Sequence, residues 1–317
     1  MSRILITPRS LTSSPGEELG ALKAAGFDLV YSAPGRQPSE AELVGLVPGC
    51  VGWLAGVESI SARVLNAADQ LQVISRNGVG VDSIDLAAAE RRGIKIMTTP
   101  GANAAAVAEL TLGLIISGLR HIPESAASLK AGAWSRTQGR EVGGCAIGLI
   151  GCGAVGRAVA EFVSALGAKV LAYDLKPSFG FQPSARFAWA SLDDVLSHSD
   201  VVSLHCPALP DAAPLLNATR LGGMKKGALL VNTARATLID ERALLDALEQ
   251  GRIGWYATDV FAVEPPPPSR LLTHERVLAT PHIGAFTTEG GQRAAEIAVE
   301  NLLSVLVTPK TQRAIAR

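Results

Sequence analysis

Short apolar runs alternate with amphipathic, alanine-rich segments over residues 1–99. The apolar runs have the length and the β-branched content that buried strands require. The segments between them, EELGALKAAG and SIDLAAAERRG among others, space their charges as the exposed face of a helix does. Regular alternation of this kind is typical of a parallel sheet covered by helices. The strands predicted here are ILIT, DLVYS, CVGWLA, QVISR and IKIMT.

A second alternation of the same kind runs from residue 145 to residue 279. A long helix that begins near Pro100 and Gly101 is predicted before it, followed by a polar arm or linker around Trp134. One more amphipathic helix is predicted from Thr287 to Leu306. The predicted strands of this region are Cys145–Ile150, Lys169–Tyr173, Val201–His205, Ala228–Asn232, Trp255–Thr258 and Val277–Ala279.

The two alternations predict an α/β protein with two doubly wound parallel sheets. A chain of 317 residues is long for one hydrophobic core, so two domains are expected. Its 48% hydrophobic residues suffice for strands that are buried on both faces. Fold class and domain number therefore follow from the pattern and the length together.

Charge and composition exclude several classes of function. The net charge is zero and the pI is neutral, so neither a nucleic acid nor a membrane surface is expected as a partner. The apolar stretch from Ala102 to Gly118 carries Glu109, which indicates a buried helix rather than a membrane span. The N-terminal apolar run is too short for a signal peptide, and the four cysteines form no C-x-x-C pair, which predicts a reducing cytoplasm. The five histidines lack ligand spacing, so no metal site is predicted.

The stretch LIGCGAVGRAVAEF contains three glycines, Gly151, Gly153 and Gly156, in the pattern G-x-G-x-x-G. A predicted strand leads into it, a predicted helix leads out, and Asp174 ends the next predicted strand. This order is the fingerprint of a dinucleotide-binding βαβ unit. The alternative is a glycine turn in an α/β domain without a nucleotide.

Each residue of this fingerprint has a physical task. Gly151 permits the tight turn, Gly153 lets a pyrophosphate approach the N-terminus of the helix, and Gly156 lets helix and strand pack closely. Asp174 would accept hydrogen bonds from the ribose hydroxyls and repel a 2′-phosphate, so NAD is the predicted cofactor. Lys176, two residues further on, leaves NADP open.

Three chemically useful side chains follow the last three predicted strands. Arg235, Glu264 and His282 come after LLVN, WYAT and VLAT, so they leave the same edge of one sheet. Histidine is suited to give a proton to a carbonyl oxygen while a hydride arrives at its carbon, and a carboxylate would hold the imidazole in place. An arginine fork suits the carboxylate of a 2-oxo or 2-hydroxy acid. The alternative is a surface ion pair and an unrelated histidine.

With these motifs the sequence resembles the D-isomer-specific 2-hydroxyacid dehydrogenases, and within them the D-3-phosphoglycerate dehydrogenases. The resemblance covers about residues 50–305 and implies that Arg235, Glu264 and His282 form the catalytic set. It further implies a flavodoxin-like substrate domain, 1–99 plus 284–317, into which a Rossmann NAD-binding domain, 100–283, is inserted. The matching segments are RNGVGVDSIDL, TPGANAAAVAELTLGLI, GLIGCGAVGRAVA, VVSLHCPALPDAAPLLN, LLVNTARATLIDERALLDAL, TDVFAVEP and ATPHIGAFT.

The resemblance also assigns the remaining site residues and the assembly. It implies a homodimer formed through the cofactor domains, by the helix from Asn103 and the arm around Trp134. It implies that backbone N–H groups of the loop Asn77–Gly80 hold the substrate carboxylate. The predicted substrate site comprises Arg76, Asn77, Gly78, Val79, Gly80 and Asn103. The predicted cofactor site comprises Gly151, Gly153, Ala154, Val155, Gly156, Asp174, His205, Cys206, Pro207, Thr233, Ala234, Asp259 and Ala285.

The substrate itself is predicted to be 3-phosphoglycerate or its keto form, with Arg76 binding the phosphate. Phe286 and Ala236 depart from the family pattern and leave a glyoxylate or hydroxypyruvate reductase as an alternative. An alternative of another class is an NAD-sensing interaction protein on the same scaffold. Because the chain ends at Arg317, a short form without a C-terminal regulatory domain is expected.

Overall fold

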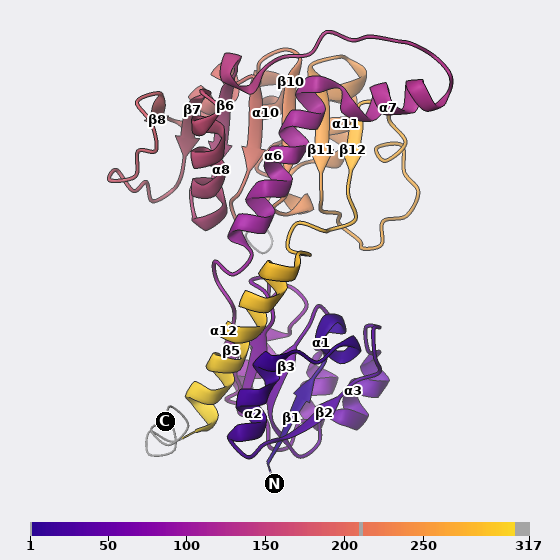
Figure 1. Ribbon diagram of the computed structural model, residues 1–317, viewed down its shortest axis with the longest axis vertical. Coiled ribbons are helices and arrows are strands. Elements are labelled where there is room, and N and C mark those ends of the chain that lie inside the picture. Colours follow the sequence, from indigo (N-terminus) through magenta and orange to yellow (C-terminus); the bar gives the residue numbers. More distant parts are fainter. Residues whose placement is uncertain (1, 209–211, 308–317) are drawn as a thin grey trace. The chain divides into compact units, whose positions relative to one another are not determined.

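The computed structural model describes residues 2–208 and 212–307, and the chain divides into two compact units (Figure 1). One unit is Met1–Asn103 with Thr287–Arg317, and the other is Ala104–Phe286. Each contains a parallel sheet with helices on both faces, which confirms the predicted fold class. The assignment of a substrate domain and a cofactor domain, with boundaries at 99/100 and 283/284, stays a prediction.

The first unit has a five-stranded parallel sheet in the order β2-β1-β3-β4-β5. Because β1 pairs with both β2 and β3, the strand order reverses at β1, and in open α/β sheets ligands bind at the strand ends beside such a reversal. The strands are β1 (Arg3–Ile6), β2 (Asp28–Tyr31), β3 (Cys50–Ala55), β4 (Val73–Arg76) and β5 (Lys95–Met97). The helices are α1 (Arg9–Ser13), η1 (Glu17–Leu19), α2 (Gly20–Ala24), α3 (Glu40–Leu46), α4 (Ala62–Ala67), α5 (Leu86–Arg91) and α12 (Thr288–Leu306).

Two apolar layers hold this unit together. Trp53 and Ile74 pack with α3, α4 and α5 on one face of the sheet. Ile4 and Leu54 pack with α1, α2 and α12 on the other face. The C-terminal segment therefore completes the core of the N-terminal unit, as Leu302 on α12 is fully buried there.

The second unit has a seven-stranded parallel sheet in the order β12-β11-β10-β9-β6-β7-β8. Its strand order reverses at β6, which pairs with β7 on one side and with β9 on the other. The strands are β6 (Ala146–Ile150), β7 (Lys169–Tyr173), β8 (Phe187–Trp189), β9 (Val201–Leu204), β10 (Ala228–Asn232), β11 (Ile253–Thr258) and β12 (Val277–Ala279). The helices are α6 (Ala104–Arg120), α7 (Ile122–Lys130), η2 (Val142–Gly144), α8 (Ala154–Ala165), α9 (Leu192–His198), α10 (Ala218–Gly223), η3 (Ala236–Leu238) and α11 (Glu241–Glu249).

Helices α6 and α8 cover one face of this second sheet, and they lie in front of it in Figure 1. Helices α9, α10 and α11 pack on the other face. Eight of the residues of α6 are buried, which agrees with a core helix. Among the described residues no single helix is long and apolar enough to cross a membrane.

Two elements of the second unit have no counterpart in the sequence predictions. Strand β8 is only three residues long, and Phe187 and Trp189 within it form edge-to-face contacts with Phe181 and Phe179. Helix α7 has no buried residue, and it falls in the stretch predicted to be a polar arm or linker. Helix α6 begins at Ala104, a turn later than expected, because Gly101 has a φ of +83°.

Candidate active site

The glycine loop lies between β6 and α8. Gly151 has a φ of +93°, and a Cβ atom there would lie 2.6 Å from the backbone nitrogen of Cys206. A Cβ on Gly156 would lie 2.2 Å from the carbonyl oxygen of Gly151, so helix and loop touch through backbone alone. Gly153 is the N-cap of α8, and a Cβ there would meet nothing within 4 Å. The two tight glycines and the open one, with Ala154 and Val155 in the first helical turn, fit a pyrophosphate at this helix N-terminus.

Asp174 lies directly after β7 and both of its carboxylate oxygens accept backbone hydrogen bonds. Cys152 N–H donates to Oδ2 over 2.8 Å, and Lys176 N–H donates to Oδ1 over 2.8 Å. The same carboxylate thus holds the glycine loop against the end of β7. Each oxygen keeps a second lone pair for a ligand hydroxyl.

His282 and Glu264 are in direct contact. His282 Nδ1 lies 2.8 Å from Oε1 and 2.7 Å from Oε2 of Glu264. The carboxylate also accepts a hydrogen bond from Phe261 N–H over 3.1 Å, which fixes its own position. With Nδ1 engaged, the other ring nitrogen, Nε2, is the one left to exchange a proton with a ligand. Both side chains are partly exposed, at 51% and 38%.

The backbone that carries His282 is fixed by a buried aspartate. Asp259 follows β11 and is only 2% exposed. Its Oδ1 accepts from Thr280 Oγ1 over 2.6 Å and from Ile283 N–H over 2.8 Å, and its Oδ2 accepts from Gly284 N–H over 2.7 Å. His282 between them adopts a φ of +51°, which is unusual for a residue with a side chain.

Arg235 follows β10, the strand that pairs with β11. Asn232, fully buried at the end of β10, donates from Nδ2 to the Arg235 carbonyl over 2.9 Å and accepts from Ala234 N–H over 3.0 Å. Thr233 Oγ1 lies 2.9 Å from Thr111 Oγ1 on α6. Register pairs Asn232 with Thr258, so Arg235 and Asp259 leave neighbouring strand ends. The predicted catalytic residues are therefore gathered at one edge of one sheet.

The residues after β9 complete this edge. His205 N–H donates to the Ile150 carbonyl over 2.7 Å and its Nε2 lies 2.9 Å from Ser203 Oγ. Burial lowers the pKa of His205 to about 4 and raises the pKa of the Cys206 thiol. Pro207 and Ala285 are exposed. His205 is therefore neutral at physiological pH.

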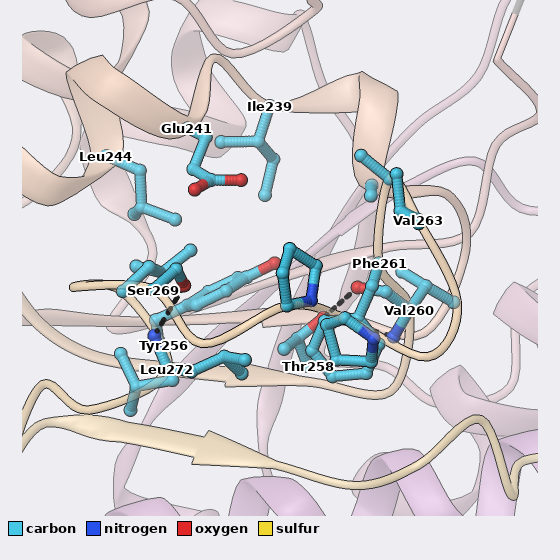
Figure 2. Close-up of a pocket in the computed structure, with 16 residues that line it drawn as sticks. Ile239, Glu241, Leu244, Tyr256, Thr258, Val260, Phe261, Val263, Ser269 and Leu272 are labelled. Atoms are coloured by element: carbon cyan, nitrogen blue, oxygen red, sulfur yellow. Dashed lines mark hydrogen bonds between the residues drawn. The ribbon is translucent and has the colours of Figure 1, made fainter.

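A cavity of about 160 Å³ lies behind the loop that carries Glu264 (Figure 2). Ile239, Glu241 and Leu244 face Tyr256 and Val260 across it. None of the three predicted catalytic residues is among its lining residues. The cavity is thus separate from the site at the strand ends.

In the first unit, the predicted carboxylate loop follows β4. Arg76 is only 9% exposed, and it donates to two carbonyls of this loop, from Nε to Gly80 over 3.1 Å and from Nη1 to Asn77 over 2.8 Å. The Gly78 carbonyl accepts from Thr99 N–H over 3.0 Å. In a trans peptide the N–H points opposite to the C=O. The N–H groups of Val79 and Val81, which share peptides with the Gly78 and Gly80 carbonyls, therefore point away from Thr99 and Arg76.

The amide groups of this loop are open to a ligand. Within residues 2–208 and 212–307, no acceptor pairs with the N–H groups of Val79 and Gly80. The buried Oδ1 of Asn77 and Oγ1 of Thr99 also lack hydrogen-bond partners there. Asn103 is the last residue before α6 and is half-buried.

Comparison with known proteins decides the family. Residues 112–284 match the family model described as D-isomer specific 2-hydroxyacid dehydrogenase, NAD binding domain. The chain belongs to this family. It is 41% identical over 268 residues to D-3-phosphoglycerate dehydrogenase of Pongo abelii, covering 83% of this chain and 50% of that one. It is 38% identical over 317 residues to glyoxylate reductase of Thermofilum pendens, covering 96% and 92%.

Solved structures of similar proteins agree with this assignment. A Thermus thermophilus protein has a TM-score of 0.85 at 38% identity, with 96% of each chain covered. D-2-hydroxyisocaproate dehydrogenase has a TM-score of 0.81 at 26% identity, with 97% of each chain covered. The chain spans about half the length of the D-3-phosphoglycerate dehydrogenases that it matches.

Several positioning residues of this D-2-hydroxyacid dehydrogenase fold were not predicted from the sequence. Asn232, Thr111 and Thr280 hold the loops of the predicted residues but touch no ligand in the predicted scheme. A buried polar residue at a strand end was the available signal for Asn232. Thr111 gave none, since its partner is 122 positions away.

Proposed function

We propose that the protein transfers a hydride reversibly between NAD and C2 of a D-2-hydroxy acid or the matching 2-oxo acid. The contact of His282 Nδ1 with both carboxylate oxygens of Glu264 carries this proposal. It leaves Nε2 as a proton donor and acceptor at the strand ends of the NAD-binding domain, the edge at which Arg235 also follows its strand.

In this proposal each residue has one task, and NAD, when bound, supplies the nicotinamide that accepts or donates the hydride. The N-terminus of α8 and the open face of Gly153 bind the pyrophosphate, and Asp174 accepts from ribose hydroxyls. His205, Cys206, Pro207, Thr233, Ala234, Asp259 and Ala285 complete the proposed cofactor site.

The substrate is bound through its carboxylate and its C2 oxygen. The N–H groups of Val79 and Gly80 hold the carboxylate, with Arg235 as a charged donor beside the C2 oxygen. His282 gives a proton to this oxygen during reduction and removes it during oxidation, while Glu264 stabilises the imidazolium that forms. Asn103, in the first unit, is a further proposed substrate residue.

For the substrate we propose 3-phosphoglycerate and its keto form, phosphohydroxypyruvate, on the strength of the resemblance around Arg76. The second candidate is hydroxypyruvate or glyoxylate. This second candidate is favoured by the hydrogen bonds of Arg76, because two of its N–H groups donate to loop carbonyls and are thus not directed at a phosphate. The chain also spans 88% of a hydroxypyruvate reductase of Thermotoga maritima at 38% identity.

A panel of 2-oxo acids with NADH and NADPH tests this function. We expect NADH consumption with at least one of phosphohydroxypyruvate, hydroxypyruvate and glyoxylate, and weaker activity with NADPH. A protein that binds NADH tightly but turns over none of the panel would be the NAD-sensing interaction protein instead.

We also propose a homodimer and a cytoplasmic location. Ile122 and Leu129 on α7 and Trp134 after it are apolar and exposed, at 48%, 59% and 83%. A second copy of the chain would remove this apolar patch from water. All four cysteines are free, as expected in a reducing compartment. Sedimentation of the wild type and of Leu129→Glu tests the dimer, which the charged variant should weaken.

A further inference from the structure

Arg9 is a cation at the ligand-binding edge of the first unit whose function is not explained by the fold. It is the first residue of α1 and follows Pro8, directly after β1. Its side chain is exposed, and within the described residues it makes no hydrogen bond and no ion pair. Two other cations near this edge are engaged, since Arg36 pairs with Glu42 and Arg293 donates to the Ala102 carbonyl.

The loop that carries Arg9 is tied to the loop after β3. Glu58 is only 1% exposed, and its Oε1 accepts from Gly56 N–H over 2.9 Å and from the Thr7 hydroxyl. Trp53 Nε1 donates to the same hydroxyl over 2.9 Å. A Cβ on Gly56 would lie 3.1 Å from the Cα atom of Pro8, so the two loops touch through their backbones.

The loop after β3 in turn touches the proposed carboxylate loop. Asn77 N–H donates to the Ala55 carbonyl over 2.8 Å. The ends of β1, β3 and β4 therefore form a continuous row in which the open amides of Val79 and Gly80 lie at one end and Arg9 at the other. Neighbouring strands in a sheet are about 4.8 Å apart, so the two spacings from β1 through β3 to β4 separate these groups by about 10 Å.

This spacing suits a three-carbon acid with an anion at its far end. Four bonds of about 1.5 Å join the carboxylate carbon of phosphoglycerate to its phosphorus, so the extended molecule covers about half of the row. The long, flexible arginine side chain covers the rest. The row also contains the strand reversal at β1, beside which ligands bind in open α/β sheets.

Resting on the function proposed above, we propose that Arg9 binds the distal anionic group of the substrate, a phosphate monoester. Arg76, whose donors face the loop carbonyls, positions the amides that hold the carboxylate. An arginine fork at the edge pairs with two phosphate oxygens and leaves unphosphorylated acids without this contact. Arg9 is thus a specificity-determining residue and Arg76 a positioning residue.

The test compares phosphohydroxypyruvate with hydroxypyruvate in wild type, Arg9→Gln, Arg76→Lys and Arg91→Gln. Arg91 is the matched control, because it is an exposed arginine of the same unit at the C-terminus of α5, where the chain returns to the opposite sheet edge. In Arg9→Gln, kcat/KM for phosphohydroxypyruvate divided by kcat/KM for hydroxypyruvate should fall about ten- to a hundredfold. Arg91→Gln should keep the ratio and the activity, and Arg76→Lys should lower both kcat/KM values while keeping the ratio.

Calorimetric binding of 3-phosphoglycerate gives a readout that needs no turnover. Arg9→Gln should weaken this binding while D-glycerate binds both proteins alike. An unchanged ratio and unchanged binding in Arg9→Gln, or no 3-phosphoglycerate binding to wild type, would overturn the role of Arg9. Turnover of hydroxypyruvate in that case would leave the proposed dehydrogenase function standing. If 3-phosphoglycerate binding depended on Arg9 but the protein turned over no substrate, the role of Arg9 would be supported and the proposed dehydrogenase function would be refuted.

Discussion

The two sheet edges are built on different chemistry. At the edge of the second unit, side chains hold side chains and loops: Glu264 contacts His282, and Asp259 binds the Thr280 hydroxyl before it and two backbone N–H groups after it. At the edge of the first unit, Arg76 and Thr99 bind the carbonyls from within, and the amides of Val79 and Gly80 are left open. A reaction that moves a proton requires a titratable side chain, whereas a carboxylate is held as well by backbone. The second edge should therefore respond to loss of a functional group, and the first to a change of backbone shape.

Removing the imidazole should have the largest effect. His282→Ala deletes the proposed proton donor but leaves the glycine loop and Asp174 untouched, so turnover should fall about 10²- to 10⁴-fold with near-normal NADH binding. Steady-state rates and NADH fluorescence titration measure both. His198→Ala is the control, since His198 is exposed on α9. Normal turnover in His282→Ala would remove the side-chain chemistry assigned to this edge.

A change of backbone shape should disturb the other edge. Gly78 has a φ of +151°, and a Cβ there would lie 3.0 Å from Nη1 of Arg76. Gly78→Ala should strain the loop backbone by about 1–3 kcal/mol. It should raise KM for every 2-oxo acid by about tenfold or more and leave NADH affinity unchanged. Gly20→Ala, in an open helical position, is the matched control. If KM stayed at the wild-type value, the loop would not hold the carboxylate.

His205, a partly buried titratable side chain at the second edge, should make stability depend on pH. Burial lowers the pKa of His205 to about 4, so between pH 6.5 and pH 4 the unfolded chain binds a proton that the folded chain does not. Stability from this residue is present above pH 6.5 and is lost as the pH falls, by about 2 kcal/mol from pH 7 to pH 5. Urea unfolding at both pH values measures it. Between pH 7 and pH 5 the free energy of unfolding of His205→Asn should fall by about 2 kcal/mol less than that of the wild type. An equal fall in both proteins would contradict the role of His205.

Asp174 should have the smallest effect of the four. Its carboxylate accepts hydrogen bonds from Cys152 N–H and Lys176 N–H as well as from the proposed ribose. Asp174→Ala should therefore weaken NADH binding by about tenfold and NADPH binding by less. Titration of both cofactors measures the preference. A wild-type preference for NADPH would show that Lys176 or a neighbour decides the choice instead.

Local pattern was sufficient for most of the fold. The buried strands are continuous apolar runs, and the glycine loop stands between a strand and a helix, so both fold class and family follow from residues close in sequence. The order of Arg235, Glu264 and His282 after three successive strands placed them at one edge, because parallel strands share their carboxyl ends. Strand β8 and helix α7 were missed; β8 is a three-residue strand at the sheet edge, and α7 buries no residue.

Tertiary structure decided how the groups at each edge are used. The sequence shows Arg76 as a cation beside a glycine-rich loop, and only the fold turns its donors onto the carbonyls of that loop. The sequence shows Arg9 far from Val79, and only the strand order β1-β3-β4 brings their loops into one row. Hydrogen bonds such as that from the Thr7 hydroxyl to Glu58, or from Asn232 to the Arg235 carbonyl, depend on side-chain direction, which the sequence pattern does not give. The sequence determined which chemistry was present, and packing determined which groups face a ligand, because periodicity reports burial but not the partner of a polar side chain.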